Sequence, residues 1–452
     1  MHPSSGDDAD VIVVGAGPAG STAAAHLAGA GVTTLVLDKA VFPRAKACGD
    51  GLTPRAVKEL IYLGLPLGQA DGWTRNRGLR VFGGGHRLEL PWPALASFPD
   101  FGLTMPREEF DLRLVRHARR AGAEVVENAN VTAPLLDRAN GRVVGVVAAT
   151  AAGERRFRAP VVVAADGVAA RLATAIGRQK KANRPVGVAV RARFRLPRPP
   201  RGDQLEWMES HLELWDGPAQ TGKLMPGYGW VFPEAPAPAA GPAPADQSAA
   251  DQSPARAAVV NVGVGSVASS AQAAGAAKVN YRELLTRWAA GLSPAWGFGL
   301  EDMIDRPRSA ALPMAFNRQP LYARGLVLVG DAGGMVSPFD GEGIAYAMQS
   351  GRLAAGAIAQ ALARPKGDGR EAALRTYPEL MKESLGGYFS LGRVFVKLIE
   401  HPQVMRVCTR YGLPRPTLMK LVMKLLSDLY EPRGGDWMDR TIATLARMAP
   451  AA

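Results

Sequence analysis

The chain has 452 residues, a length that exceeds one compact core and predicts two or more lobes. Its two cysteines, Cys48 and Cys408, exclude a disulfide framework and favour a reducing compartment. The formal charge of +13 permits attraction to phosphate-rich partners, and no apolar stretch is long enough to span a bilayer.

Residues 1–9 lack the charged and apolar regions of a signal peptide. We therefore expect a disordered arm and a cytoplasmic protein.

A nucleotide-binding pattern follows directly. A β-branched run at 11–14 leads into Gly-x-Gly-x-x-Gly, an Ala-rich helix, and a second strand that ends in Asp38. Gly15 makes the tight turn, Gly17 lets the backbone approach a pyrophosphate, and Gly20 lets helix and strand pack closely. Asp38 is spaced to hold a ribose hydroxyl. The pattern predicts a bound dinucleotide, although a Gly-rich turn that binds nothing is the alternative.

The middle of the chain changes from helical to strand periodicity. We predict a helix at 107–120, a strand at 122–126, and a hairpin formed by 141–149 and 156–165. Ten Lys or Arg and no acids lie between Arg171 and Gly202. Within this stretch, residues 186–196 alternate between apolar side chains and arginines, which predicts a strand with one arginine face. That face is either a solvated sheet edge or a basic patch turned to membrane or substrate.

Further strands are expected at 228–233 and 259–265, paired as a hairpin around a low-complexity loop at 234–256. A helix at 281–288, a buried strand at 326–330 and a helix at 343–362 follow, and the chain is helical with proline breaks from about residue 377.

The predicted fold is α/β (α+β), with a discontinuous nucleotide-binding lobe. Its first part is 10–184 and its second part is 311–376. A β-rich substrate lobe at 185–310 is inserted between them, and 377–452 forms a helical C-terminal region.

Three later segments extend the pattern: Val163–Gly167, Gly325–Ala332 and Pro338–Ile344. With the N-terminal fingerprint, they resemble the FAD-dependent fold of aromatic hydroxylases. Within that superfamily, the segments Pro43–Leu52, Pro106–Asp111, Pro226–Pro233 and Asn261–Gly265 resemble the geranylgeranyl reductase family. The C-terminal segments His401–Met405 and Gly434–Asp436 are similar to the actinobacterial members that reduce menaquinone.

The resemblance implies FAD as cofactor. It implies cofactor contacts by Gly15, Ala16, Gly17, Pro18, Ala19, Gly20, Asp38, Lys39, Arg44, Ala47, Cys48, Gly49, Arg107, Val131, Asp166, Gly330, Asp331, Gly341, Gly343 and Ile344. It also implies a substrate face made by Tyr228, Trp230 and Phe232, with Cys48, Tyr228 and Trp230 as catalytic residues. The bland alternatives are a surface cation for Arg107, a small buried hydrophobe for Cys48, and plain sheet core for the aromatic residues.

The implied activity is saturation of a C=C bond in a polyprenyl chain, either one isoprene unit of menaquinone or a geranylgeranyl group. An aromatic monooxygenase or halogenase and a non-enzymatic prenyl carrier are the alternatives. No metal and no nucleic acid is expected. The electron donor stays open between NAD(P)H and a reduced carrier, because Ala170 replaces the usual Ser of the Asp-Gly motif.

A hydrophobic isoprenoid substrate implies peripheral contact with the inner face of the cell membrane. Residues 417–430 offer a broad apolar face, made by Leu418, Leu421, Val422, Leu425, Leu426 and Leu429. Lys420 and Lys424 form a narrow polar stripe on the same helix. It either lies in the membrane interface or packs on the core.

Overall fold

The structure of the protein is a computed structural model, which describes residues 8–219, 221–235, 257–267, 279–399 and 401–449. The predicted arm (1–9) and the predicted low-complexity loop (234–256) fall mostly outside these residues.

A six-stranded sheet forms the centre of the first lobe, in the order β20-β21-β12-β1-β2-β8. All of its neighbours are parallel except β20 and β21. Its strands are β1 (Val11–Val14), β2 (Thr34–Leu37), β8 (Glu124–Val126), β12 (Val161–Ala164), β20 (Tyr322–Ala323) and β21 (Leu326–Leu328).

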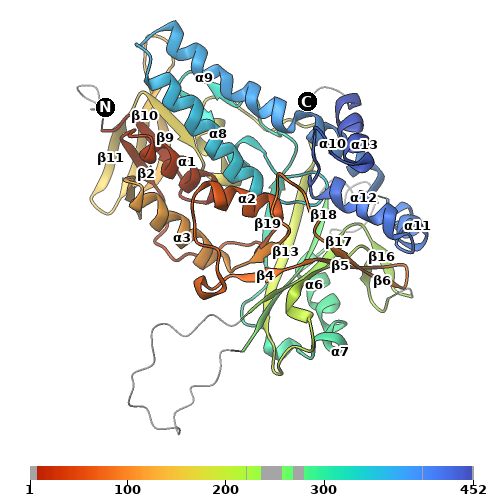
Figure 1. The fold of residues 1–452 in the computed structure, drawn as a ribbon. Coiled ribbons are helices and arrows are strands. Elements are labelled where there is room, and N and C mark those ends of the chain that lie inside the picture. The colour runs from red at the N-terminus through yellow and green to blue at the C-terminus, as the bar shows by residue number, and fades with distance from the viewer. Residues whose placement is uncertain (1–7, 220, 236–256, 268–278, 400, 450–452) are drawn as a thin grey trace.

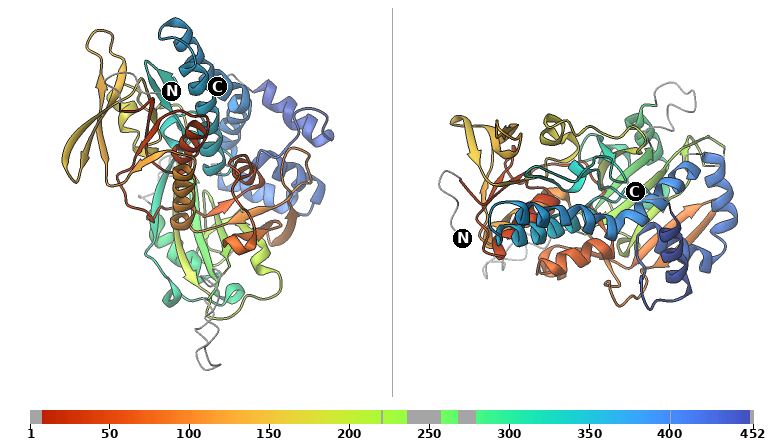
Figure 2. Two further views of the ribbon diagram at one scale, coloured as in Figure 1. Left: turned by 60° about the vertical axis from the view of Figure 1, so that its left-hand side comes forward. Right: turned by 90° about the horizontal axis from the view of Figure 1, so that it is seen from above.

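The two faces of this sheet are covered differently. Val11 and Val13 pack under three helices, α1 (Pro18–Gly29), α3 (Arg107–Arg120) and α8 (Ile344–Leu362). Ile12 and Val14 pack against a three-stranded sheet made by β9 (Asn130–Leu136), β10 (Val143–Thr150) and β11 (Gly153–Arg158). Figure 2 shows this yellow sheet projecting from the helical layer. Alternation along one buried strand therefore supplies both cores.

A seven-stranded sheet forms the second lobe, in the order β19-β13-β18-β17-β14-β5-β6 (Figure 1). Its strands are β5 (Gly78–Gly83), β6 (His86–Pro91), β13 (Val186–Arg195), β14 (Trp207–His211), β17 (Tyr228–Glu234), β18 (Val259–Val267) and β19 (Arg308–Pro313). Every pair is antiparallel except β14 and β5. The helix α6 (Tyr281–Ala290) packs on one face through Leu284 and Leu285, which leaves the other face turned to the first lobe.

Smaller elements complete the fold. Two short sheets contain β3 (Gly51–Leu52), β4 (Thr74–Asn76) and β7 (Gly102–Thr104), and β15 (Leu214–Asp216) with β16 (Lys223–Met225). The remaining helices are α2 (Pro54–Tyr62), α4 (Arg171–Ala175), α7 (Ser293–Trp296), α9 (Asp368–Met381), α10 (Gly387–Ile399), α11 (Pro402–Gly412), α12 (Pro416–Leu426) and α13 (Trp437–Met448).

Several expected elements are confirmed. The helix at 107–120 has the predicted bounds, and β17 pairs with β18 as the predicted hairpin. Two expectations about the strands are wrong. The segment 156–165 is not one strand, because only residues up to Arg158 pair with β10, whereas 161–164 enter the large parallel sheet. The second sheet is also not confined to 185–310, since β5 and β6 join it from the first part of the chain.

The arginine face of β13 is not a solvated edge. β13 lies between β19 and β18, and Arg191 is 1% exposed. Its guanidinium is ion-paired with Asp305, and Arg193 faces Asp305, Glu108 and Glu234. Of the two alternatives, the solvated edge is wrong, because distant segments supply carboxylates to this face, and Arg191 lines a cavity between the two sheets.

The predicted C-terminal helix is shorter than expected and packs on the protein. α12 ends at Leu426, and Met419 and Met423 are buried in a cluster with Val81 and Trp92. Lys424 is buried and paired with Asp436 and Asp439, so the predicted polar stripe is not exposed as a whole. Among the described residues, no helix is long and apolar enough to cross a membrane.

Candidate flavin and substrate cavity

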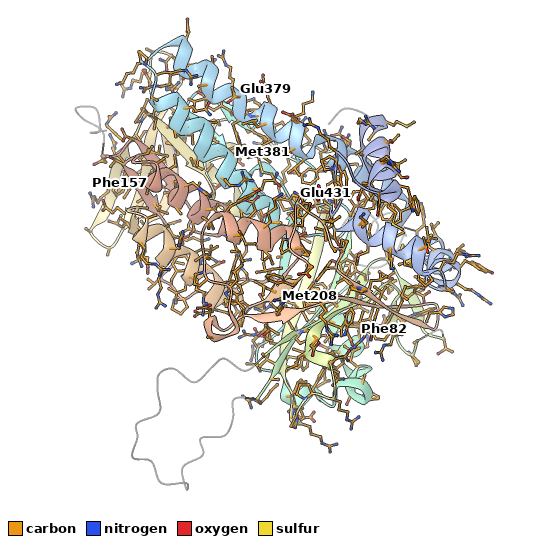
Figure 3. The ribbon with its side chains drawn as sticks, in the orientation of Figure 1. Phe82, Phe157, Met208, Glu379, Met381 and Glu431 are labelled. Carbon is orange, nitrogen blue, oxygen red and sulfur yellow. The ribbon has the colours of Figure 1, made fainter. Side chains whose placement is uncertain are left out.

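A cavity of about 740 Å³ lies between the two sheets. Gly15, Gly17 and the first turn of α1 line one end of it, and Trp92, Met208 and Phe232 line the other. Figure 3 labels Met208 near the centre of the molecule and Phe82 farther out on the same sheet. The cavity thus joins the nucleotide-binding turn to an apolar sheet face.

The glycines of the first turn have structural reasons to be glycine. Gly15 has φ +101°, and a Cβ there would lie 2.4 Å from the carbonyl oxygen of Ala165. A Cβ on Gly20 would lie 1.8 Å from the carbonyl oxygen of Gly15. The turn therefore stays compact, and Gly17, Pro18 and Ala19 at the start of α1 line the cavity. The N–H groups in the first turn of a helix lack intrahelical partners, which suits a bound anion.

Asp38 lies at the cavity with both carboxylate oxygens engaged by backbone N–H groups, one from the glycine turn and one from its own loop. One oxygen accepts from the Ala16 N–H at 2.7 Å, and the other accepts from the Ala40 N–H at 2.8 Å. Each oxygen retains a lone pair for a further donor, as a ribose hydroxyl would require.

Two arginines line the cavity, the buried Arg107 and the partly exposed Arg44. Arg107 is 6% exposed and makes a bidentate contact with Asp111, 2.9 Å for each bond. Arg44 approaches the same carboxylate at 3.3 Å. The alternative of Arg107 as a surface cation is wrong. The two guanidiniums leave this site with more positive than negative charge, as phosphate binding requires.

The acids at the carboxyl ends of β12 and β21 also reach the cavity. Asp166 accepts from the Leu172 N–H through Oδ2, while its buried Oδ1 has no partner among the described residues. Burial raises the pKa of Asp166. Burial also raises the pKa of Asp331, and Lys46 and Arg107 oppose that shift. Such acceptors fit the hydroxyls of a ribityl chain, which can donate to them.

The turn before α8 comes close to the cavity without side chains. Gly341 has φ +78°, and a Cβ added to Gly343 would have only Val336 and Asp331 within 4 Å, the nearer at 3.5 Å. Space beside a backbone turn at a helix start suits a flat ring that accepts from N–H groups. Together with the unpartnered Oδ1 of Asp166, this shape fits FAD.

The aromatic residues of β17 share one face, as the spacing predicts. The ring centroids of Tyr228 and Trp230 are 6.1 Å apart, and those of Trp230 and Phe232 are 6.2 Å apart. All three line the cavity, so they are not only sheet core. Tyr228 donates to the carbonyl of Asp340, and Trp230 donates to Asn261 at 3.0 Å. These bonds fix the orientation of the rings.

Cys48 lines the cavity that joins the nucleotide-binding turn to the apolar sheet face. Burial raises the pKa of its thiol, and nearby Arg107 opposes the shift. Its sulfur accepts from the Asp50 N–H at 3.3 Å, and its carbonyl accepts from Asn261. The thiol is therefore held in its protonated form beside a positive charge that can stabilise a thiolate.

Most of the expected site residues meet at this cavity. It is lined by Gly15, Gly17, Pro18, Ala19, Asp38, Lys39, Arg44, Ala47, Cys48, Gly49, Arg107, Val131, Asp166, Tyr228, Trp230, Phe232, Asp331, Gly341, Gly343 and Ile344. Ala16, Gly20 and Gly330 stand behind the lining. Ala16 holds Asp38, and a Cβ on Gly330 would lie 2.9 Å from the Cβ of Ala19.

Sequence reasoning missed other lining residues, among them Lys46, Asp50, Arg191, Met208 and Glu342. Asp50 and Lys46 lie in the same segment as Cys48, at positions to which the resemblance gives no role. Glu342 lies inside the Pro-x-x-Gly-x-Gly turn at a position that the pattern leaves free. Nothing in the local sequence around Met208 marks it.

The comparisons with known proteins agree with this geometry. The family of the FAD binding domain matches residues 8–213. The menaquinone reductase of Mycobacterium tuberculosis is 36% identical over 96% of this chain and 94% of its own length. A digeranylgeranylglycerophospholipid reductase of Methanopyrus kandleri is 29% identical, covering 86% of this chain and 90% of its own.

The fold has a solved counterpart. The structure of a geranylgeranyl bacteriochlorophyll reductase-like protein from Thermoplasma acidophilum aligns with a TM-score of 0.72 and 21% identity. The alignment covers 97% of this chain and 99% of that one.

Proposed function

The chain belongs to the geranylgeranyl reductase family of FAD-dependent oxidoreductases, and we propose that it saturates a C=C bond in a polyprenyl chain. The proposed substrate is menaquinone, of which one isoprene unit is reduced; a geranylgeranyl group is the other candidate. One observation carries the proposal: a single cavity joins the nucleotide-binding turn to the aromatic face of β17.

The residues of the cavity have separate tasks in this proposal. The α1 turn, Arg44 and Arg107 would hold the FAD pyrophosphate, and Asp331 would hold the ribityl chain. Reduced FAD, when bound, supplies a hydride. The rings of Trp230 and Phe232 would orient the apolar chain and keep water away from it.

An isolated alkene accepts a hydride poorly, so one carbon needs a proton while the other receives the hydride. Cys48 is the proposed proton donor, because it lines the cavity and its pKa is raised by burial. The Arg107 guanidinium beside it would stabilise the thiolate that remains.

The test is an anaerobic incubation of the dithionite-reduced protein with menaquinone or with geranylgeranyl diphosphate. Quinone products are reoxidised in air before mass spectrometry, so that reduction of the ring is not counted. We expect a gain of two hydrogens in the prenyl chain. No gain on either substrate removes the proposal. Substrate-stimulated oxygen uptake with NAD(P)H would favour a monooxygenase or halogenase, and a purified protein without a flavin spectrum would favour a carrier.

We also propose peripheral contact with anionic membranes through α11 rather than through the face of α12. Val404, Val407 and Tyr411 follow helical spacing on α11 and are 37%, 58% and 58% exposed. Arg406 and Arg410 flank them and are exposed. An apolar stripe with flanking arginines suits an anionic lipid surface.

The position of α11 also suits delivery of an apolar substrate. Residues from α12 and from the segment after α11 pack in one cluster with Trp92 and Met208, which line the cavity. In Figure 1 the α11 and α12 helices lie together at the end of the seven-stranded sheet.

Vesicle flotation tests this contact. The protein is expected to float with phosphatidylglycerol vesicles at low salt, and the Val407→Glu/Tyr411→Glu variant is expected to stay at the bottom. Leu136→Glu is the matched control, because Leu136 is 48% exposed on β9, far along the chain from α11. Equal flotation of the double variant and the wild type would remove the proposed contact.

A further inference from the structure

A buried charge cluster lies where the seven-stranded sheet meets the cavity, and the proposed chemistry leaves it unused. Its centre is a pair of carboxyl groups, Asp50 and Glu234, which are 1% and 5% exposed. Burial, the charge of Asp50 and a hydrogen-bonding interaction with it all raise the pKa of Glu234, so the two carboxyl groups are neighbours. Two carboxylates can form such a bond only if one of them carries a proton.

The surroundings of Glu234 support this. Its Oε1 atom is buried, and no donor in the described part of the chain reaches it. The nearest guanidinium, that of Arg193, lies 4.0 Å from Oε2. A proton on one carboxyl group would turn this orphaned acceptor into a partner in a hydrogen bond.

The arginines near the pair are already engaged by other acids. Arg191 is 1% exposed and ion-paired with Asp305, and Arg193 is shared among Glu108, Glu234 and Asp305. Among the residues that the structure describes, Glu234 therefore has no guanidinium of its own to compensate a buried negative charge, which favours a proton on the pair.

Asp50 connects the pair to the cavity. It lines the cavity, and its Oδ2 accepts from the Asn261 amide at 2.5 Å. The same amide nitrogen donates to the Cys48 carbonyl, and the Asp50 N–H donates to the Cys48 sulfur. Burial raises the pKa of Asp50 to about 6, opposed by Arg191, Arg107, Asn261 and Arg193. Burial and Asp50 raise the pKa of Glu234.

We propose that Asp50 and Glu234 share one proton and that this pair restores the proton which Cys48 gives to the substrate. This inference rests on the proposed function. In the step, the S–H bond of Cys48 breaks as a C–H bond forms, and the other carbon takes the hydride from reduced FAD, which is oxidised. The O–H bond of the pair then breaks to reprotonate the thiolate. Water returns a proton to the pair.

Glu234 is a positioning residue in this scheme, so its test needs a readout beyond rate. The test compares infrared spectra of the oxidised wild type and Glu234→Gln, recorded without substrate at neutral pH. The difference between the two spectra is expected to contain the C=O band of a protonated carboxylic acid, whereas bands common to both proteins, such as that of Glu342, cancel. Glu234→Gln keeps the shape and offers an N–H donor to Asp50, so this variant should fold and lose the band of the pair. Glu209→Gln is the matched control: Glu209 is a buried acid in the same sheet, paired with Arg80, and the band should persist.

The second readout is the pH profile of prenyl reduction by the pre-reduced protein. In the wild type the rate should fall as rising pH removes the shared proton. In Glu234→Gln the rate should be at least about tenfold lower, with that fall absent. Asp50→Asn is the second variant, and it should show the same loss.

The outcomes separate the shared proton of Asp50 and Glu234 from the proposed reductase function. Absence of the band from the difference spectrum of wild type and Glu234→Gln overturns the shared proton, whatever the substrate does. A wild-type rate and pH profile in Glu234→Gln overturn its role in proton return. A band that disappears in Glu234→Gln, with no prenyl reduction by the wild type, supports the shared proton and removes the proposed function.

Discussion

At the scale of single residues, the two cysteines have the same side chain in opposite surroundings. Cys48 lines the cavity, and Cys408 is exposed on α11. We expect Cys48→Ala to slow prenyl reduction by about a hundredfold, because it removes the proposed proton donor. Cys408→Ala should keep the wild-type rate. Single-turnover reoxidation of the flavin measures both, and equal rates for the two variants would contradict the role of Cys48.

Two glycines make a second matched pair. A Cβ on Gly263 would lie 2.0 Å from the Trp230 ring, whereas nothing lies within 4 Å of a Cβ on Gly356 in α8. Gly263→Ala should therefore displace Trp230 and cost about 1–3 kcal/mol of unfolding free energy. Gly356→Ala should stabilise the helix by about 0.5–1 kcal/mol. Urea unfolding measures the change in unfolding free energy of both variants. If Gly263→Ala left that free energy unchanged, the packing of Trp230 against Gly263 would be contradicted.

Residue types with a fixed spacing could be predicted from the sequence, and residues that act through distant partners could not. Tyr228, Trp230 and Phe232 share a face because strand geometry requires it. Asp50 escaped prediction because its partners, Glu234 and Asn261, are about 200 positions away along the chain.

At the scale of elements, α12 contains two lysines in contrasting places. Lys424 is 5% exposed and pairs with Asp439 at 2.5 Å, whereas Lys420 is exposed. Lys424→Ala leaves the buried Asp439 unpaired and should cost about 3–5 kcal/mol. Lys420→Ala should change stability by less than about 0.5 kcal/mol. Denaturant unfolding, combined with limited proteolysis of the C-terminal region, measures the stability of both variants. Similar losses of stability in Lys424→Ala and Lys420→Ala would contradict the docking of α12.

The turn before α8 should make stability depend on pH. Burial, with the Asp340 charge, raises the pKa of Glu342 to about 8. The folded protein therefore holds a proton between about pH 5 and pH 8 that the unfolded chain has released, so this contribution to stability is lost as pH rises. The side chain in Glu342→Gln cannot ionise. The melting temperature of this variant, relative to that of the wild type, should therefore rise as the pH is raised from about 5 to about 8.

The control is Glu379→Gln, on the exposed side of α9, which Figure 3 labels. Its difference from the wild type should stay constant with pH. A constant difference for Glu342→Gln as well would contradict the protonated state of Glu342 in the folded protein.

Elements were predicted well where their pattern is local, and poorly where packing decides. The α3 helix was found with its bounds because its periodicity and its flanking residues lie within one stretch. For the arginine face of β13, the sequence left a solvated edge open beside a basic patch turned to substrate or membrane, because an alternating pattern does not reveal that Asp305 and Glu234 cover it.

At the scale of the whole molecule, the second sheet is assembled from separated stretches of the chain. β5 and β6 join it through the parallel pair of β5 with β14, and β19 joins it on the far side of β13. Periodicity identifies strands but does not choose partners so distant, so the expected inserted lobe had the wrong limits. This assembly places Met208 and Trp92 at the apolar end of the cavity.

The central claim is that one cavity brings reduced FAD and a prenyl double bond together. The most direct test is a single anaerobic turnover in heavy water with the pre-reduced protein and menaquinone. The product is reoxidised and returned to ordinary water, so that only deuterium bound to carbon remains. The account predicts two deuterons in one isoprene unit for each flavin reoxidised. Reoxidation of the flavin with no deuterium retained on the prenyl chain would contradict it.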